Sequence, residues 1–493
     1  MSKILFINPN RWGRGITTIW IPAHAALLKN NGHKVKLFDS TFYKNWKQNE
    51  TQYNTDNLQY KPTPYENLIK YNTNDIFSDL QNIVDKYKPD IIFGGAISSH
   101  IHGEGEYVNI QYYDELLSKI STNALRISGG LQPTAKPKIM FEKFPNIDLL
   151  IRGESEFTLL QISNMVNIKG NYLELPGLVF KENGEIKINP SQPILNNMDN
   201  LGYYDYSLFD EQVFIRPYNG EIVKAVDYEL SRGCIYTCEY CVETVIQKYY
   251  GFDISSARGV LKNAYSYLRN KTAKHIFHEL ITLNKDFGIQ LIRCQDTNLL
   301  TVNRQVLSEL AELIDKSNLN LFLYIETRPE GINKSTVKLL KKLKVDGVGM
   351  GVELASQDFR EEKLSRFADQ KKIIKAFDLL KVNGIKRTAY NIIGLPEEKE
   401  KDIIDTIKFN IKLNPDNVTV AFYSPYIGTA QENKANALSY FKDYESNVDG
   451  QLRTLNRSFK ISSKTLQFYK KYFAYFEKNG LNDLNKLKKQ CNV

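Results

Sequence analysis

The sequence predicts an α/β protein with two series of alternating strands and helices and a helical C-terminal region. Short apolar runs alternate with amphipathic segments over most of the 493 residues, which is typical of parallel sheets covered by helices. Hydrophobic residues make up 42% and charged residues 25% of the chain, as in ordinary globular proteins. At about 100–200 residues per domain, this length favours about three domains.

The first series fills residues 1–170. Amphipathic segments at Ile21–Asn31 and Asn74–Tyr87 indicate helices, and Gly32 stands where a helix C-terminal glycine belongs. The polar segment Thr41–Tyr71 indicates an insertion at one edge. Ligands of such sheets bind outside the carboxyl ends of the strands. Five apolar runs predict these strands: Lys3–Asn8, Lys34–Asp39, Asp90–Gly95, Ala124–Gly130 and Asp148–Gly153.

Residues 171–215 are predicted to be a hairpin and a linker. Leu178–Asn189 indicates a β-hairpin with the turn Glu182-Asn183-Gly184. The Pro- and Asn-containing segment Pro190–Asp210 follows it and is predicted to connect two domains.

The second series fills residues 216–430, and residues 431–493 indicate helices. Ser335–Lys344 and Lys399–Lys412 have helical patterns. Six strand–helix units fit an incomplete (β/α) barrel open at one side, because a full barrel has eight. The predicted strands are Lys224–Ser231, Ile289–Asp296, Leu321–Arg328, Asp346–Glu353, Arg387–Gly394 and Asn417–Tyr426.

Composition excludes several protein classes. No apolar run approaches the ~20 residues of a membrane span, and the N-terminus lacks a signal-peptide pattern, so we expect a cytoplasmic protein. Five cysteines in 493 residues cannot form a disulfide framework. The net charge is +9, and residues 436–493 hold 11 Lys and Arg against 5 Asp and Glu. That excess indicates either a solvated helical face or a surface for an acidic substrate or nucleic acid.

The chemistry-bearing motif is SRGCIYTCEYCVE at Ser231–Glu243, just after the first strand of the second series. Three close thiolates, from Cys234, Cys238 and Cys241, bind an iron–sulfur cluster or zinc. A structural zinc site needs four ligands, and no fourth Cys or His stands near this loop. The spacing therefore favours a 4Fe-4S cluster with one open iron, with zinc or a structural cysteine cluster as alternatives. Cys294 and Cys491 stand alone and are expected to be dispensable for the cluster.

The CxxxCxxC spacing, with an aromatic residue before its last Cys, resembles the radical S-adenosylmethionine (SAM) superfamily. In that family the open iron chelates SAM, and an electron from the cluster cleaves it to a 5′-deoxyadenosyl radical. The segments CQDTNLL, GVELAS and NIIGLPEE follow in the family's order. The resemblance implies SAM contacts at Tyr240, Asp296, Arg328, Glu353, Asn391 and Gly394.

The loops of the first series resemble the cobalamin-binding domain of cobalamin-dependent radical SAM enzymes. Asn-Pro follows the first strand, Gly-Gly-x-x-Pro-Thr the fourth and Gly-Glu-x-Glu the fifth. No Asp-x-His-x-x-Gly string is present, so we expect no His ligand to cobalt, with His100 and His102 as the alternative. The implied cobalamin contacts are Asn8, Gly94, Ser98, Ser99, Gly129, Gly130, Pro133, Gly153 and Glu154.

Together these resemblances imply a Rossmann-like cobalamin-binding domain at 1–170, a partial (β/α)6 TIM-type radical SAM barrel at 216–430 and a small helical region at 431–493. They imply a radical SAM enzyme that methylates an unactivated carbon of an unknown substrate through methylcobalamin. The alternative is a non-methylating ring-forming or rearrangement enzyme. A small-molecule or biosynthetic-intermediate substrate and an electron donor such as flavodoxin or ferredoxin are the expected partners.

Two other classes are disfavoured. Enzymes of tRNA methylthiolation carry a second cysteine trio in the N-terminal domain, and no Cys precedes Cys234. A cobalamin- or redox-sensing regulator would need a nucleic-acid-binding module, and the sequence shows no zinc finger, basic zipper or clear helix-turn-helix. Nucleic acid is therefore not an expected partner.

Overall fold

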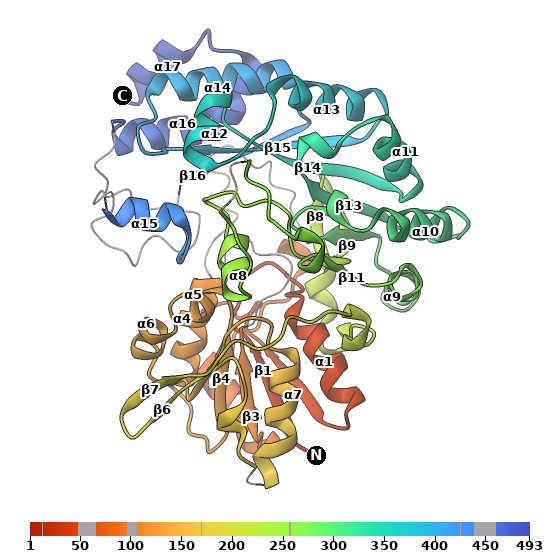
Figure 1. Cartoon of the computed structure of the whole chain (residues 1–493), viewed down its shortest axis with the longest axis vertical. Coiled ribbons are helices and arrows are strands. Elements are labelled where there is room, and N and C mark those ends of the chain that lie inside the picture. Colours follow the sequence, from red (N-terminus) through yellow and green to blue (C-terminus); the bar gives the residue numbers. More distant parts are fainter. Residues whose placement is uncertain are drawn as a thin grey trace.

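The computed structural model describes residues 1–11, 13–47, 66–95, 106–168, 170–255, 258–423, 425–437 and 460–493. It is an α/β structure with two large sheets, each of seven strands and mostly parallel. The N-terminal sheet and its helices form the lower half of Figure 1, and the second sheet with the C-terminal helices forms the upper half. In the described residues, no helix is both long and apolar enough to cross a membrane.

The first sheet has the strand order β2-β1-β3-β4-β5-β6-β7. The order 2-1-3-4-5 of its parallel part is that of a doubly wound sheet, and all five predicted strands are present. One face packs against α1 (Trp20–Asn30) and α7 (Glu156–Met165), and the other against α3 (Ile76–Tyr87) and α4 (Glu106–Leu117). Its parallel strands are β1 (Lys3–Asn8), β2 (Lys34–Asp39), β3 (Ile91–Gly94), β4 (Leu125–Gly129) and β5 (Leu149–Ile151).

The predicted hairpin forms and extends the first sheet. Its strands β6 (Leu178–Glu182) and β7 (Glu185–Ile188) are antiparallel, and β6 pairs with β5. Asn183 and Gly184 have φ values of 51° and 84°, which the two-residue turn of such a hairpin requires. The connector that follows lies against α1, where Lys29 Nζ is 2.6 Å from Asp205 Oδ2.

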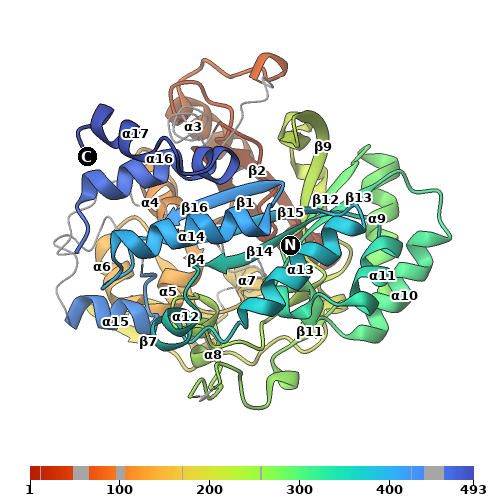
Figure 2. The same cartoon turned by 90° about the horizontal axis from the view of Figure 1, so that it is seen from above.

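The second sheet has the order β16-β15-β14-β13-β12-β9-β8. All six predicted strands are present and parallel, and the sheet is curled (Figures 1 and 2). Its end strands β16 and β8 do not pair with each other, so the barrel is open. The sequence did not predict β8 (Ile215–Tyr218), which is antiparallel to β9. The parallel strands are β9 (Glu221–Tyr228), β12 (Leu291–Cys294), β13 (Phe322–Thr327), β14 (Val345–Glu353), β15 (Lys386–Ile393) and β16 (Asn417–Phe422).

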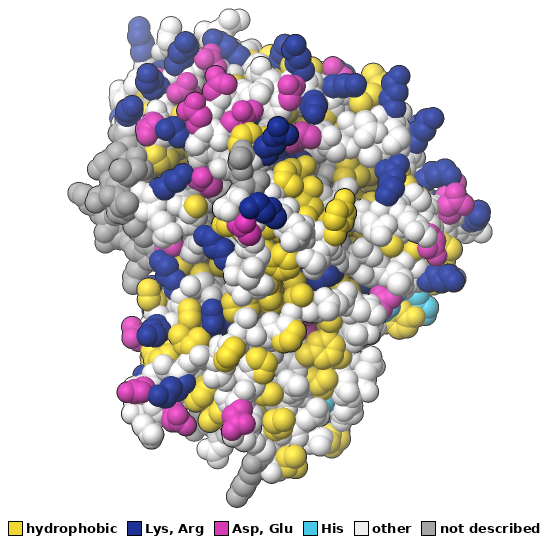
Figure 3. All heavy atoms as spheres, in the orientation of Figure 1, with side chains coloured by type: hydrophobic (Ala, Val, Ile, Leu, Met, Phe, Trp, Pro, Cys, Tyr) yellow, Lys and Arg dark blue, Asp and Glu magenta, His cyan; other side chains and the backbone are white. Residues whose placement is uncertain are grey.

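Helices cover the outer face of the curled sheet. They are α9 (Ala273–Asp286), α10 (Arg304–Asp315), α11 (Lys334–Lys342), α13 (Gln370–Val382) and α14 (Glu400–Leu413). The described C-terminal residues form α15 (Ala430–Ala437), α16 (Ser463–Asn479) and α17 (Leu484–Gln490), and α16 packs on α14 and β16. On the face shown in Figure 3, Lys and Arg side chains are most numerous over this upper half.

Candidate functional site

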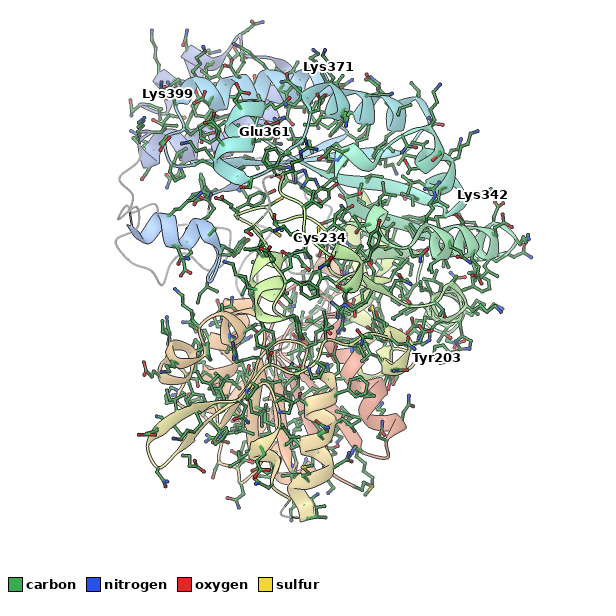
Figure 4. The ribbon with its side chains drawn as sticks, viewed as in Figure 1. Tyr203, Cys234, Lys342, Glu361, Lys371 and Lys399 are labelled. Atoms are coloured by element: carbon green, nitrogen blue, oxygen red, sulfur yellow. The ribbon has the colours of Figure 1, made fainter. Side chains whose placement is uncertain are left out.

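The cysteine loop lies between the two halves of the molecule, where Figure 4 labels Cys234. It begins after β10 (Ser231–Arg232), which pairs with β11 (Arg269–Asn270) in a small sheet that the sequence did not predict. Gly233 has φ 98°, and a Cβ there would lie 2.6 Å from the carbonyl oxygen of Tyr267, so only glycine fits. The loop ends in α8 (Glu243–Tyr249).

The three loop cysteines line one cavity and are available as ligands. All three are free, Cys234 and Cys238 are buried, and Cys241 is half-buried. Burial raises the pKa of the Cys234 thiol to about 12, so its thiolate needs a cationic partner. Among the described residues no three His, Cys, Asp or Glu side chains converge on one point. A cubane needs no such convergence, because each cysteine binds a different iron.

A cavity of about 300 Å³ opens above the cysteine loop inside the curled sheet. Three of the six predicted SAM contacts, Tyr240, Arg328 and Glu353, line it together with all three cysteines. The other lining residues are Tyr236, Val242, Glu243, Thr297, Asn298, Glu326, Thr327, Gly349, Gly351, Arg366 and Tyr390.

Tyr240, Glu353 and Arg366 form one polar group in this cavity. The Tyr240 hydroxyl donates to Glu353 Oε1 at 2.9 Å, and Arg366 Nε lies 3.5 Å from the same oxygen. Arg366 also donates to the Gly351 carbonyl oxygen at 2.5 Å. Glu353 has φ 63°, an uncommon conformation for a residue with a side chain. The strand end is therefore shaped to turn this carboxylate into the cavity.

Arg328 lies directly beside the cysteine loop. Its Nη1 donates to the sulfur of Cys238 at 3.5 Å, and its guanidinium stacks on the Tyr236 ring at 3.6 Å. Glu330 Oε1 accepts from Arg328 Nη2 at 2.6 Å. This places a buried positive charge next to one of the three loop cysteines.

Three predicted SAM contacts, Asp296, Asn391 and Gly394, do not line the cavity. Asp296 is buried and accepts hydrogen bonds from the Leu230 N–H and the Ser231 hydroxyl. It therefore fixes the segment that leads into the cysteine loop. Asn391 faces α14, where it exchanges hydrogen bonds with Asn410, because its neighbour Tyr390 takes the inward position. The Gly394 N–H is bound by Glu398 Oε2 at 2.5 Å.

Several cavity residues were not predicted from the sequence. Arg366 follows α12 (Gln357–Leu364) in a loop that carries no motif. Glu326 and Tyr390 lie on the inward faces of their strands. The alternation of inward and outward side chains along a strand was the one sequence signal that could have identified them. Glu243 lies two residues after the last cysteine, and burial raises its pKa to about 7.

The carboxyl edge of the first sheet holds the predicted cobalamin contacts, and their surroundings differ. A Cβ on Gly94 would lie 2.5 Å from the Tyr113 ring, so this glycine serves internal packing. Asn8 donates to Asp39 Oδ1 at 3.2 Å within the sheet. Gly129 ends β4, and Gly130 has φ 113° directly before α5 (Leu131–Ala135), which contains Pro133. Ser98, Ser99, His100 and His102 lie outside the described residues.

The loop after β5 is occupied by the other half of the molecule. A Cβ on Gly153 would lie 2.4 Å from the Tyr249 ring. The Glu154 N–H donates to the Tyr250 hydroxyl, and Arg269 Nη1 is 2.6 Å from Glu154 Oε1. Gly153 and Glu154 therefore join the two halves, and their contact with cobalamin stays a prediction.

The side-chain N–H group of Gln132 is a buried donor at this edge that has no acceptor among the described residues. Gln132 is 1% exposed, and its Nε2 makes no hydrogen bond to the described residues. A buried donor without an acceptor costs about 1–3 kcal/mol. Gln132 stands two residues after Gly130, so the β4–α5 loop offers both backbone space and an unused donor to a ligand.

The family comparison matches a central part of the chain, from the end of β9 into α14. The profile of the Radical SAM superfamily matches residues 228–409. An uncharacterized methyltransferase of Pyrococcus horikoshii, PH0819, is 26% identical over 354 residues, which are 72% of this chain and 71% of that protein. An anaerobic magnesium-protoporphyrin IX monomethyl ester cyclase of Rubrivivax gelatinosus is 23% identical over 441 residues, 86% of this chain and 68% of the cyclase.

Two solved structures share the fold over most of the chain. The radical SAM methyltransferase TsrM from Kitasatospora setae, solved with cobalamin and a [4Fe-4S] cluster bound, superposes with a TM-score of 0.62 and 16% identity, covering 86% of this chain and 72% of TsrM. The cobalamin-dependent enzyme OxsB, solved with aqua-cobalamin and SAM bound, superposes with a TM-score of 0.64 and 14% identity. The match covers 100% of this chain and 70% of OxsB.

Proposed function

We propose that this chain, which belongs to the radical SAM superfamily, is a cobalamin-dependent radical SAM methyltransferase. One observation carries the proposal: the cavity lies directly above the three cysteines, in the half of the molecule that contains the curled sheet. Buried ion pairs of Arg232 and Arg269 hold that half against the carboxyl edge of the doubly wound sheet. A radical made in that cavity would form beside the edge where such a sheet binds its ligand.

Cys234, Cys238 and Cys241 would hold the 4Fe-4S cluster, which supplies the electron for reductive cleavage of SAM. The protein's part is binding and orientation. Arg328 and Arg366 offer donors to the carboxylate of SAM, and Glu353 offers an acceptor to its hydroxyl or ammonium groups. Tyr240 fixes the Glu353 carboxylate, so the acceptor is oriented before SAM binds.

Cobalamin is the second proposed cofactor, held at the β4–α5 loop by the backbone at Gly130 and by the Gln132 amide. Bound there, cobalamin would supply a transferable methyl group. We also propose a Rossmann-like domain at 1–170, a partial (β/α)6 barrel at 216–430 and a helical region at 431–493. The hairpin within 171–215 would then belong to the first domain.

A reductant is required because SAM cleavage consumes one electron. We propose a flavodoxin or ferredoxin as its donor and a small molecule or biosynthetic intermediate as the substrate. Free cysteines and an oxygen-sensitive cluster favour a reducing compartment, so the cytoplasm is the proposed location. Ring formation without methyl transfer is the second candidate, because one relative is named a cyclase.

The test is anaerobic purification with cobalamin supplied, followed by mass analysis of the bound cofactors. With SAM and dithionite, we expect 5′-deoxyadenosine from the wild-type protein and none from a triple Cys→Ala variant of residues 234, 238 and 241. Failure of the wild-type protein to cleave SAM after full cluster loading would refute the radical chemistry.

Two further measurements separate the alternatives. SAM with a deuterated methyl group labels the product of a methyltransferase but not the product of a ring-forming enzyme. Nitrogen hyperfine splitting from a protein His on Co(II) would refute the proposal that no His binds cobalt.

A further inference from the structure

The inside of the curled sheet has an apolar floor. Along β13, Leu323 and Ile325 belong to the core beneath the outer helices, whereas Phe322 and Tyr324 face the inside with Val223, Ala225 and Leu291. Alternate residues of a strand face opposite sides, so the next inward positions can be read along each strand. Those positions form a polar layer between this floor and the cysteine loop.

Tyr324, Glu326 and Tyr390 make part of the polar layer. The hydroxyls of Tyr324 and Tyr390 are 2.8 Å apart, and Tyr390 donates to Glu326 Oε1 at 3.2 Å. Gly349 of the intervening strand β14 makes room for them, since a Cβ there would lie 2.6 Å from the Tyr390 hydroxyl oxygen. Glu326, Gly349 and Tyr390 also line the cavity above the cysteines.

Arg293 supplies the positive charge of this layer. It shares the inward face of β12 with Leu291, and β12 is paired on both sides, yet 33% of its side chain is exposed. Because the outer face of the sheet is covered by helices, that exposed surface belongs to the barrel interior. Tyr324, Tyr390 and a second guanidinium, that of Arg14, act electrostatically on Arg293.

Asp227 is the ion-pair partner of Arg293, but it is already engaged. Arg293 Nη1 is 3.8 Å from Asp227 Oδ1, which is too long for a hydrogen bond. Asp227 Oδ2 pairs with Arg216 Nη1 at 2.6 Å and accepts from the N–H and hydroxyl of Thr17. Its Oδ1 accepts from Gln295 Nε2 at 2.6 Å. Within the described residues, no hydrogen bond reaches the Arg293 guanidinium.

We propose that Arg293 binds an anionic group, a carboxylate or a phosphate, of the substrate. A guanidinium inside a protein is stabilised by a hydrogen-bonded anion and binds carboxylates and phosphates through two parallel hydrogen bonds. The group would rest between the apolar floor and the cavity, which places the rest of the substrate toward the cysteine loop. This inference rests on the proposed function and narrows its substrate to anionic molecules.

The first test needs no knowledge of the substrate. The cluster-loaded protein is treated with phenylglyoxal, which reacts with accessible guanidinium groups, and modified arginines are mapped by mass spectrometry. We expect Arg293 to react, and inorganic phosphate or acetate to slow that reaction several-fold. Protection by phosphate alone or by acetate alone tells the two anion classes apart. Arg304, exposed on α10, is the internal control and should not be protected.

Two outcomes of this test would overturn the proposal. An Arg293 that does not react is not available to a ligand. If neither phosphate nor acetate changes the rate at which Arg293 reacts with phenylglyoxal, Arg293 does not bind these anions.

The second test uses the substrate itself. A low-molecular-weight extract of the source cells is added to enzyme, SAM and dithionite, and the extract-dependent gain in 5′-deoxyadenosine is measured. Loss of a charge-assisted hydrogen bond costs about 1.5–3 kcal/mol, so R293Q should reduce this gain about tenfold or more, and R293K less. R304Q should match the wild type.

An R293Q variant with the full extract-dependent gain would contradict the proposal. If the extract does not stimulate the wild type, the phenylglyoxal test alone decides. If the wild type makes no 5′-deoxyadenosine at all, the proposed function fails, whereas the anion protection of Arg293 is still measurable.

Discussion

Arg232 of β10 and Glu156 at the start of α7 form an ion pair across the two halves of the molecule, with Nη2 and Oε1 2.6 Å apart. Both side chains are almost fully buried, 2% and 1% exposed. Glu229 also pairs with Arg232. Burial alone would raise the pKa of Glu229, but the charge of Arg232 lowers this pKa to about 2. The strand that leads into the cysteine loop is thereby tied to the first sheet.

The first prediction concerns this ion pair. Arg232→Met leaves Glu156 and Glu229 buried without their cation, and breaking a buried pair costs about 3–5 kcal/mol. We expect that loss in the free energy of unfolding measured with urea. The matched control is Arg126→Met, since Arg126 pairs with Asp148 at the half-exposed surface and its loss should cost about 1 kcal/mol or less. Equal losses in both variants would contradict the role of burial.

The second prediction concerns the cluster ligands. Replacing Cys234, Cys238 or Cys241 by Ala removes one thiolate, so we expect most of the iron and all SAM cleavage to be lost. Iron per protein and the visible absorbance of the cluster measure this. Cys294 packs in the core behind the curled sheet, and Cys491 lies near the Tyr472 hydroxyl, so Ala at either position should keep the iron. Full iron content in the triple variant would refute the assignment.

The third prediction concerns Arg328, whose Nη1 donates to Cys238 Sγ. A positive hydrogen-bond donor at a ligand sulfur stabilises the more negative, reduced cluster. Arg328→Met should therefore shift the midpoint potential of the cluster to a more negative value, measured by redox titration with EPR detection. Arg328→Lys keeps the charge and should shift it less. An unchanged potential in Arg328→Met at equal iron content would show that the contact has no electronic effect.

The fourth prediction is a pH dependence set by Glu398. Burial raises the pKa of this carboxyl to about 8, against the N–H groups of Gly394 and Leu395, which lower it. Between its ordinary pKa near 4.5 and 8 the folded state binds more protons than the unfolded state. Its contribution to stability is therefore full below that range and is lost as the pH rises through it.

Glu398→Gln tests this contribution. The amide stays neutral at every pH. As the pH rises from about 5 to about 8, the free energy of unfolding measured with urea should therefore fall less in the variant than in the wild type. The exposed pair of Lys363 and Glu397 beside it provides the control variant Glu397→Gln. Parallel curves for wild type and Glu398→Gln would speak against the raised pKa.

The fifth prediction concerns cobalamin retention. Gln132→Leu removes the buried amide nitrogen that has no acceptor in the described residues, so the folded protein should be no less stable. Cobalamin retained per protein after anaerobic loading should fall, because the lost amide would no longer bind the cofactor. The half-buried Gln81, which donates to Asp85 far from this loop, supplies the control Gln81→Leu. Wild-type retention in Gln132→Leu would exclude Gln132 from the cofactor site.

Local patterns were enough to predict every strand of the two large sheets except β8. Apolar runs separated by amphipathic segments located β1 to β5 and the six parallel strands of the second sheet, because burial on two faces demands such runs. The turn at Asn183 and Gly184 predicted its hairpin, since few residues accept positive φ. Two elements without such a pattern, β10 and β11, were missed because each has two residues.

The candidate site was predicted only in part, and the misses have physical causes. Asn391 was chosen where the inward residue is Tyr390, because a strand's sequence does not show which of its two faces lines the cavity. The pairing of Glu154, a predicted cofactor contact, with Arg269, 115 residues away, was not predicted. A pairing between distant segments depends on how two sheets pack, and neither segment carries a signal of it.

By itself, the sequence determined the cysteine motif, the strands and the chemistry that three close thiolates support, because these depend on neighbours within a few positions. Only the tertiary structure decided that Arg366 reaches Glu353, that Arg328 touches Cys238 and that Arg293 stands inside the barrel with its partner Asp227 already engaged. Those relationships arise from the packing of strands and loops against one another, for the last two pairs across more than 60 residues of chain. A side chain's charge and partners follow from that packing and not from its place in the sequence.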